Sequence, residues 1–158
     1  MSLWRGLGPA VPWPRTPEAL RAGVGASIGL GLSALVLFAF TPGADELLAK
    51  PLLIAPFGAS AFLIFVVPNS PLAQPWSVVV GNGLSALVAL LVLQAGLPPL
   101  FAAPLAVGLA VLAMATARAL HPPGGAVALF AALAAPSGWG FVASPVVAGS
   151  VALVICGI

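Results

Sequence analysis

The first long apolar stretch of this chain carries no charged side chain, and that feature decides which solvent the chain folds in. Residues 22–40 form an uncharged run that would be about 28 Å long as a helix, close to the ~30 Å hydrocarbon core of a bilayer. Only 5% of the residues are charged and 61% are hydrophobic, whereas about a quarter of a soluble domain is charged. We therefore expect an integral membrane protein.

Three further apolar runs are long enough to cross a bilayer as helices, at residues 77–97, 100–120 and 141–158. Two shorter runs, at residues 52–67 and 126–135, lie between the long ones. Each short run has proline and glycine within or just before its start, which marks a helix break. The sequence therefore predicts full-length helices that alternate with shorter, broken ones.

The segment HPPGG, which begins at His121, is the sharper of the two breaks. Proline lacks a backbone donor and disfavours helix in the residue before it, so the third long helix should end near Leu120. His121 and Pro122 should then be extended. Gly124 and Gly125 would let the backbone turn tightly into a new helix.

The two short runs resemble each other. With a constant offset of 66 positions, the segment APFGASAFLIFVV aligns without a gap with HPPGGAVALFAAL, so that Pro56 pairs with Pro122. Gly58 pairs with Gly124 in the same register. A match at a fixed distance indicates an internal duplication. The predicted organisation is a transmembrane domain at residues 22–158, with repeat 1 at 22–97 and repeat 2 at 100–158.

The charges favour one of two topologies. Three crossings per repeat would make the copies inverted, whereas two crossings and a re-entrant loop would make them parallel. Arg5, Arg15 and Arg21 precede the first apolar run, so the positive-inside rule places the flank at residues 1–21 in the cytoplasm. If every short run crosses, Arg118 lies on that side too.

The predicted fold class is therefore all-α: a polytopic transmembrane helical bundle of six spans. It would be a tandem, inverted repeat of helix, broken helix and helix. Four full spans with two re-entrant half-helices are the alternative.

A broken helix inside a membrane frees backbone groups that lipid does not satisfy, at a cost of several kcal/mol each. These groups must be buried against protein or line a wet cavity. A helix that restarts at residues 58–60 or 124–126 also points free amides and the positive end of its dipole inward. Many transporters place paired broken helices near the midplane of the membrane. The pattern predicts a site for a small anion.

Polar side chains near the breaks each have two interpretations. His121, the one histidine of the chain, either contacts substrate or protons or is a loop residue bonded to nearby carbonyls. Asn82 either joins helices or lines a pore. Ser60 either caps a helix or contacts substrate. Arg118 either snorkels to the interface or attracts an anion. The candidate substrate-binding residues are Pro56, Gly58, Ser60, Asn82, Arg118, His121, Pro122, Pro123, Gly124 and Gly125.

Other classes of function lack the residues that they need. The three acidic residues lie outside the long apolar runs, and one histidine with one cysteine makes no metal-ligand cluster. We therefore expect no enzyme activity, no metal and no cofactor. A net charge of +2 without a basic stripe excludes a nucleic-acid partner.

Three blocks of the sequence resemble the HPP family of small integral membrane proteins. They are PFGASAFLIF, SVVVGNGLSALVAL and HPPGGAVAL, and the last contains the His-Pro-Pro motif at residues 121–123. The likeness covers most of residues 19–156. It implies a membrane protein of four or more spans, with plastid and cyanobacterial relatives associated with nitrite transport. Nitrite or a similar small anion is the cargo that the resemblance implies.

The predicted function is a transporter or channel for a small inorganic anion, nitrite first, that binds at the paired broken helices. A channel for a small neutral solute and a structural membrane subunit are the alternatives. Six short spans enclose little interior, so we expect a homo-oligomer, with a dimer favoured because twofold assemblies are the commonest. The expected location is the lipid bilayer of the bacterial inner (plasma) membrane.

Overall fold

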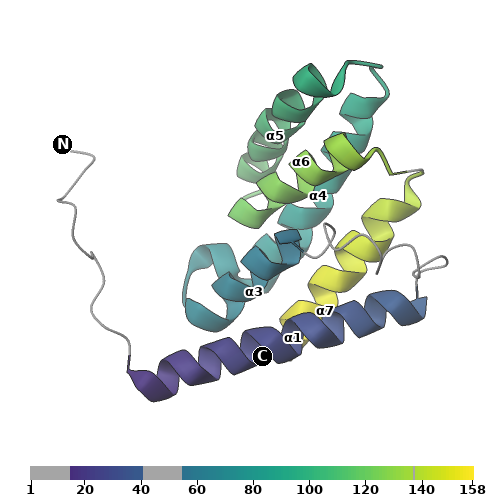
Figure 1. Cartoon of the computed structure of the whole chain (residues 1–158). Coiled ribbons are helices and arrows are strands. Elements are labelled where there is room, and N and C mark those ends of the chain that lie inside the picture. Colours follow the sequence, from purple (N-terminus) through teal and green to yellow (C-terminus); the bar gives the residue numbers. More distant parts are fainter. Residues whose placement is uncertain (1–14, 41–54, 137) are drawn as a thin grey trace, which may run out of the picture.

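The computed structural model describes residues 15–40, 55–136 and 138–158, most of which lie in helices (Figure 1). The α-helices are α1 (Thr16–Phe40), α3 (Ala55–Val66), α4 (Pro75–Leu93), α5 (Pro99–Thr116), α6 (Pro122–Ala134) and α7 (Ala148–Gly157). A 3₁₀ turn (Pro71–Ala73) precedes α4, and a π turn (Val142–Val147) precedes α7. None of the described residues lies in a strand, which confirms the predicted all-α class.

Proline opens three of these helices, at Pro75, Pro99 and Pro122. The first residue of a helix has no partner for its N–H, so proline, which lacks that group and has a nearly helical φ, is tolerated there. α4 and α5 begin close to their predicted starts. Both end earlier than predicted, at Leu93 and Thr116.

Two long helices differ from their predicted extents. α1 begins at Thr16, well before the predicted residue 22, and Glu18 in its first turn interacts favourably with the helix dipole. The helix predicted over residues 141–158 is interrupted at Ser144, whose backbone is extended (φ −139°, ψ 123°). The cause is Pro145, because proline disfavours helix in the residue before it.

α4 lies at the centre of the bundle and packs against α5, α6 and α7, while α1 lies along one side against α3 and α7 (Figure 1). The surface shared by α4, α5 and α6 is rich in alanine, including Ala86, Ala106 and Ala128. A second apolar cluster joins α3, α4 and α7 through larger side chains such as Phe57 and Leu153. Small residues let helix backbones approach closely, which is the packing expected in a membrane.

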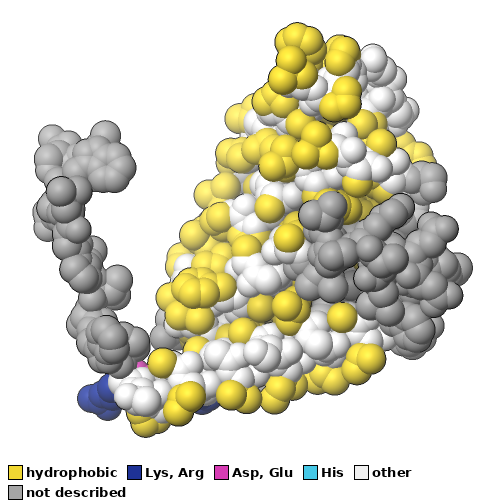
Figure 2. Space-filling view, in the orientation of Figure 1, with side chains coloured by type: hydrophobic (Ala, Val, Ile, Leu, Met, Phe, Trp, Pro, Cys, Tyr) yellow, Lys and Arg dark blue, Asp and Glu magenta, His cyan; other side chains and the backbone are white. Residues whose placement is uncertain are grey.

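Large apolar side chains cover much of the outside of the bundle (Figure 2). On α1 they form an exposed stripe that consists of Leu20, Val24, Ile28, Leu32 and Leu35. A water-soluble monomer rarely exposes so much contiguous apolar surface, whereas a lipid-facing helix does. Among the described residues, α4 and α5 are each long and apolar enough to cross a bilayer. Which further helices cross, and so the choice between six spans and four, stays a prediction.

The two predicted repeats contain comparable elements in the same order. The first contains α1, α3 and α4, and the second contains α5, α6 and the segment that ends in α7. Helices at equivalent positions make equivalent contacts. Within the repeats, α1 packs against α3 as α5 packs against α6, and between the repeats α1 packs against α7 as α5 packs against α4. The duplication and the inversion of its copies stay predictions. Residues 52–54 of the first short run, and most of the predicted N-terminal flank, lie outside the described residues.

Candidate functional site

The helical backbone is interrupted between α5 and α6, close to the predicted place. α5 ends at Thr116, and Arg118 in the turn that follows has a left-handed backbone (φ 53°). His121 is extended (φ −142°, ψ 100°) and directly precedes α6, as predicted. Pro122 is not extended but is the first residue of α6, because the fixed φ of proline suits that position.

The imidazole of His121 lies inside the bundle, with 1% of the residue exposed. Its Nδ1 lies 2.8 Å from the carbonyl oxygen of Leu72 in the 3₁₀ turn. Its Nε2 lies 2.8 Å from the hydroxyl oxygen of Ser60 on α3. A carbonyl oxygen only accepts, so Nδ1 carries a hydrogen, and the neutral imidazole turns its Nε2 lone pair toward Ser60.

Asn82 of α4 extends this chain of contacts across the bundle. Its side-chain nitrogen Nδ2 donates to the hydroxyl oxygens of Ser150 on α7, at 3.0 Å, and of Ser60, at 3.4 Å. Ser60 also lies 3.3 Å from the carbonyl oxygen of Pro56, one helical turn earlier. The Asn82 side-chain oxygen Oδ1 is buried and has no hydrogen-bond partner among the described residues.

We call Ser60, Asn82, His121 and Ser150 the polar cluster. The four residues come from α3, α4, the turn before α6, and α7, and each is at most 1% exposed. In an apolar bundle each of these groups would cost about 1–3 kcal/mol if left without a hydrogen bond, so their convergence is the most specific chemical feature of the described fold. The predicted site residues Ser60, Asn82 and His121 are thus brought together.

Comparison with known proteins agrees with the sequence resemblance. The sequence model of one family, described as "HPP, transmembrane region", matches residues 12–158. The chain belongs to the HPP family. It is 35% identical over 134 residues to one transmembrane protein of Dictyostelium discoideum, an alignment that covers 79% of this chain and 46% of the relative. It is 40% identical over 110 residues to another transmembrane protein of that organism, covering 65% and 35%.

This HPP-family chain therefore spans less than half the length of these curated relatives. No solved structure matches it. Membership of the family makes it a membrane protein, as the sequence predicted.

Two glycines of the HPP-family chain allow helices to meet beside the polar cluster. A Cβ atom on Gly81 of α4 would lie 2.7 Å from the carbonyl oxygen of Ala119 and 2.8 Å from the Cβ of His121. A Cβ atom on Gly124 of α6 would lie 2.7 Å from the hydroxyl oxygen of Ser85. Gly124 lies within α6 rather than in a turn, so the predicted tight turn is wrong. Its lack of a side chain serves close packing instead.

The start of α6 offers fewer free amides than predicted. The new helix begins at Pro122 rather than at residues 124–126, and neither Pro122 nor Pro123 has an N–H. The N–H of Gly124 donates to the carbonyl oxygen of His121, at 2.8 Å. The polar groups that face the interior here are therefore side chains, and backbone amides contribute little.

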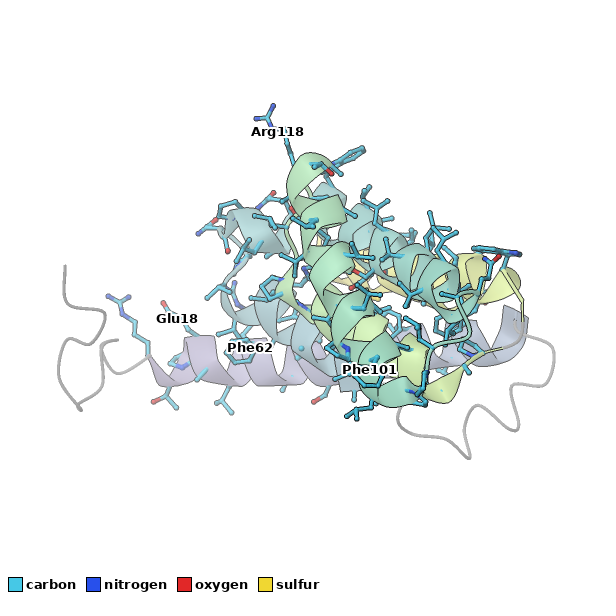
Figure 3. The ribbon with its side chains drawn as sticks, turned by 90° about the horizontal axis from the view of Figure 1, so that it is seen from above. Glu18, Phe62, Phe101 and Arg118 are labelled. Carbon is cyan, nitrogen blue, oxygen red and sulfur yellow. The ribbon has the colours of Figure 1, made fainter. Side chains whose placement is uncertain are left out.

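The remaining predicted site residues lie around the polar cluster or outside it. Arg118 is exposed and projects away from the bundle (Figure 3). Pro122 is exposed as well, whereas Pro123 is buried. A Cβ atom on Gly58 would meet nothing within 4 Å, and one on Gly125 would meet Val107 only at 3.9 Å. Gly58 lies inside α3, which is continuous from Ala55 to Val66, so the predicted helix restart at residues 58–60 is wrong. None of these positions touches His121 or Asn82 through a described hydrogen bond.

Two members of the site were not predicted. Ser150 lies in an apolar run that contains serine, glycine and alanine, and nothing in its spacing separates it from a packing residue. The Leu72 carbonyl oxygen belongs to a backbone, so no side-chain pattern could identify it. The one available signal was the proline at residue 71, which favours a turn and hence a carbonyl outside a regular helix.

Proposed function

We propose that this chain forms the membrane part of a transporter or channel for a small inorganic anion, with nitrite as the leading candidate. The observation that carries the proposal is the polar cluster, in which side chains from four separate elements meet in an apolar interior. The two short helices α3 and α6 flank it, and each has proline in its first turn. The solute would pass where the polar cluster interrupts the apolar packing.

The unpaired oxygen of Asn82 supports a role in passage over a purely structural one. Polar groups that only join helices are selected to have partners, because an unpaired one costs free energy in a low-dielectric interior. A side chain that binds a passing solute needs one hydrogen-bonding atom that has no partner within the protein. Since the cluster is buried, passage requires α3 or the turn before α6 to move.

Transport also explains the serine and histidine better than catalysis does. Ser60 and His121 lie at the distance of a nucleophile and its base. In such enzymes the second ring nitrogen usually faces a carboxylate and the nucleophile faces a cleft. Here Nδ1 faces the Leu72 carbonyl oxygen, and Ser60 is fully buried. We therefore propose that the chain is not an enzyme.

One observation favours a second candidate, a channel for a small neutral solute. In the described geometry the free atom of Asn82 is an oxygen, which accepts hydrogen bonds but donates none. A solute with N–H groups, such as urea, would satisfy it directly. A structural membrane subunit without transport is the third possibility.

Flux measurements on purified protein in liposomes separate these candidates. Uptake of nitrite, nitrate, formate, chloride and urea would be compared with uptake into protein-free liposomes. We expect nitrite flux that His121→Ala abolishes and Ser85→Ala retains. Ser85 is the matched control because it is buried on α4 but, within the part of the chain that the structure describes, bonds only to the Gly81 carbonyl oxygen of its own helix, at 2.7 Å. A preference for urea would exclude the anion, and no flux for any solute would favour the structural subunit.

The same proposal sets the orientation and the assembly. We place the N-terminus in the cytoplasm because Arg15 and Arg21 lie at the start of α1. The large apolar side chains along α1 and α5 give either lipid or a second copy a surface to cover. A homodimer in the plasma membrane of a bacterium is the arrangement that we propose to test, by cross-linking in liposomes.

A further inference from the structure

Asn82 holds the one buried side-chain polar atom that has no partner among the described residues, its oxygen Oδ1. The residue is fully buried. Its nitrogen is directed the other way, to the hydroxyl oxygens of Ser60 and Ser150. The amide therefore has its acceptor end, and not its donor end, without a partner among the described residues.

The neutral form of His121 fixes that orientation through a chain of hydrogen bonds. Nδ1–H donates to the Leu72 carbonyl oxygen, so Nε2 accepts, and the Ser60 hydroxyl must donate its hydrogen to Nε2. With that hydrogen committed, the Ser60 oxygen is free to accept from Asn82 Nδ2. Asn82 Oδ1 is then left unpaired, and its partial negative charge repels an anion.

A second proton on the imidazole reverses the hydrogen bond between Nε2 and Ser60, while Nδ1–H still donates to the Leu72 carbonyl oxygen. Nε2–H now donates to the Ser60 oxygen, so the Ser60 hydrogen is released. If the side-chain amide of Asn82 turns by half a rotation, its Oδ1 can accept the hydrogen bond from the Ser60 hydroxyl. Oδ1 then also accepts from the Ser150 hydroxyl. The oxygen and the nitrogen of the amide have nearly the same size, so the turn preserves the packing. It replaces the unpaired acceptor with the two N–H groups of Nδ2.

The Pro56 carbonyl oxygen competes for the released hydrogen of Ser60, since it lies 3.3 Å away. That alternative leaves the amide as it is, with no gain at the unpaired position. An anion that accepts from Nδ2 stabilises the turned amide. The choice between the two arrangements therefore depends on whether an anion is present.

No other charged group on the surrounding elements offsets an imidazolium at His121. α3, the 3₁₀ turn, α4 and α6 contain no titratable side chain, and α7 contains only Cys156. Arg118 in the turn before α6 is exposed and points away (Figure 3). A buried charge is strongly disfavoured unless it is paired. The described bundle thus supplies no counter-ion, and a bound anion would.

From this geometry we infer that the polar cluster binds one proton and one small monovalent anion together. The proton occupies Nε2 of His121, and the anion accepts hydrogen bonds from the turned amide of Asn82. The inference rests on the proposed function and adds that the anion is taken up together with a proton. The pair carries no net charge, so uptake is electroneutral. Since binding linkage is reciprocal, the anion favours the proton by the same factor as the proton favours the anion.

Nitrogen NMR of the single histidine tests this directly. The chain, labelled with ¹⁵N-histidine and freed of any histidine tag, would be placed in liposomes at a pH where His121 is neutral without nitrite. We expect saturating nitrite to raise the ratio of imidazolium to neutral imidazole by about tenfold or more, within the usual range of coupling between sites. Ser85→Ala should respond in the same way, and Asn82→Ala should not respond.

Flux in the unaltered protein gives a second, independent measurement. Nitrite uptake should follow an inside-alkaline pH gradient and should not change when potassium and valinomycin set the membrane potential. Nitrite flux with an imidazole that stays neutral would overturn the inference and leave the proposed function standing. An undiminished response in Asn82→Ala would remove Asn82 as the anion contact. The absence of flux for every solute would instead overturn the proposed function itself.

Discussion

The Nε2 atom of His121 lies 2.8 Å from the hydroxyl oxygen of Ser60, although 61 positions separate the two residues in the chain. The contact joins α3 to the turn before α6, and both α3 and α6 have proline in the first turn. Because both groups are buried, removal of Ser60 leaves Nε2 of His121 without its partner, whereas removal of His121 leaves Ser60 with the Pro56 carbonyl oxygen and the Asn82 amide.

Ser60→Ala tests that contact. The substitution leaves His121 Nε2 and Asn82 Nδ2 short of a partner, so we expect the free energy of unfolding to fall by about 1–3 kcal/mol. Ser85→Ala removes a hydroxyl that bonds within its own helix, and a much smaller change is expected. Thermal unfolding in detergent, followed by circular dichroism, measures both. Equal losses in the two variants would show that the Ser60 contact is not special.

The adjacent glycines of α6 give a matched pair for helix packing. A Cβ atom on Gly124 would approach the Ser85 hydroxyl oxygen to 2.7 Å and the Met114 sulfur to 2.9 Å, whereas one on Gly125 would make only an ordinary contact with Val107, at 3.9 Å. We expect Gly124→Ala to lower the free energy of unfolding by about 1–3 kcal/mol, because the close contact of α6 with α4 must open. Gly125→Ala should be neutral or stabilise by up to about 1 kcal/mol, since alanine favours helix. Thermal unfolding in detergent measures both variants. A larger loss of stability in Gly125→Ala than in Gly124→Ala would contradict the described packing.

The sequence predicted the break at His121 and three members of the polar cluster. The reason is local: two prolines end a helix wherever they occur, and polar residues in an apolar run are rare enough to stand out. The family resemblance depended on the same short motifs, and the matched family confirms it.

The sequence could not predict how glycine is used or which distant groups complete the site. Glycine favours both tight turns and close helix contacts, and only the neighbours of Gly124 show that packing is its role. Ser150 and the Leu72 carbonyl oxygen reach the cluster through the tertiary arrangement of α7 and the 3₁₀ turn. The proline pair also removed the amides on which the predicted anion site depended, because a helix can begin directly at proline.

Gly81 links packing to the candidate site. A Cβ atom there would press on the backbone oxygen of Ala119, at 2.7 Å, and on His121. A backbone atom cannot rotate away as a long side chain does, so we expect Gly81→Ala to displace the turn that holds the imidazole. Nitrite flux should fall at least tenfold and the melting temperature should drop. Gly58→Ala is the control, because a Cβ atom there would meet nothing within 4 Å. It should keep both the nitrite flux and the melting temperature of the unaltered chain. Normal flux in Gly81→Ala would show that the turn need not hold its described position.

Arg118 tests whether a charge outside the polar cluster contributes to passage. Its backbone is left-handed (φ 53°), a conformation that costs most residues roughly 1–2 kcal/mol and glycine very little. We expect Arg118→Gly to change the free energy of unfolding by less than about 1 kcal/mol, because relieved strain offsets the added flexibility of the unfolded chain. Arg118→Val should lower it by roughly 1–2 kcal/mol, since a β-branched residue fits this backbone poorly. Nitrite flux in Arg118→Gly should match that of the unaltered chain, because the guanidinium points away from His121 and Asn82. A lower nitrite flux in a folded Arg118→Gly variant would show that the arginine side chain contributes to passage of the anion.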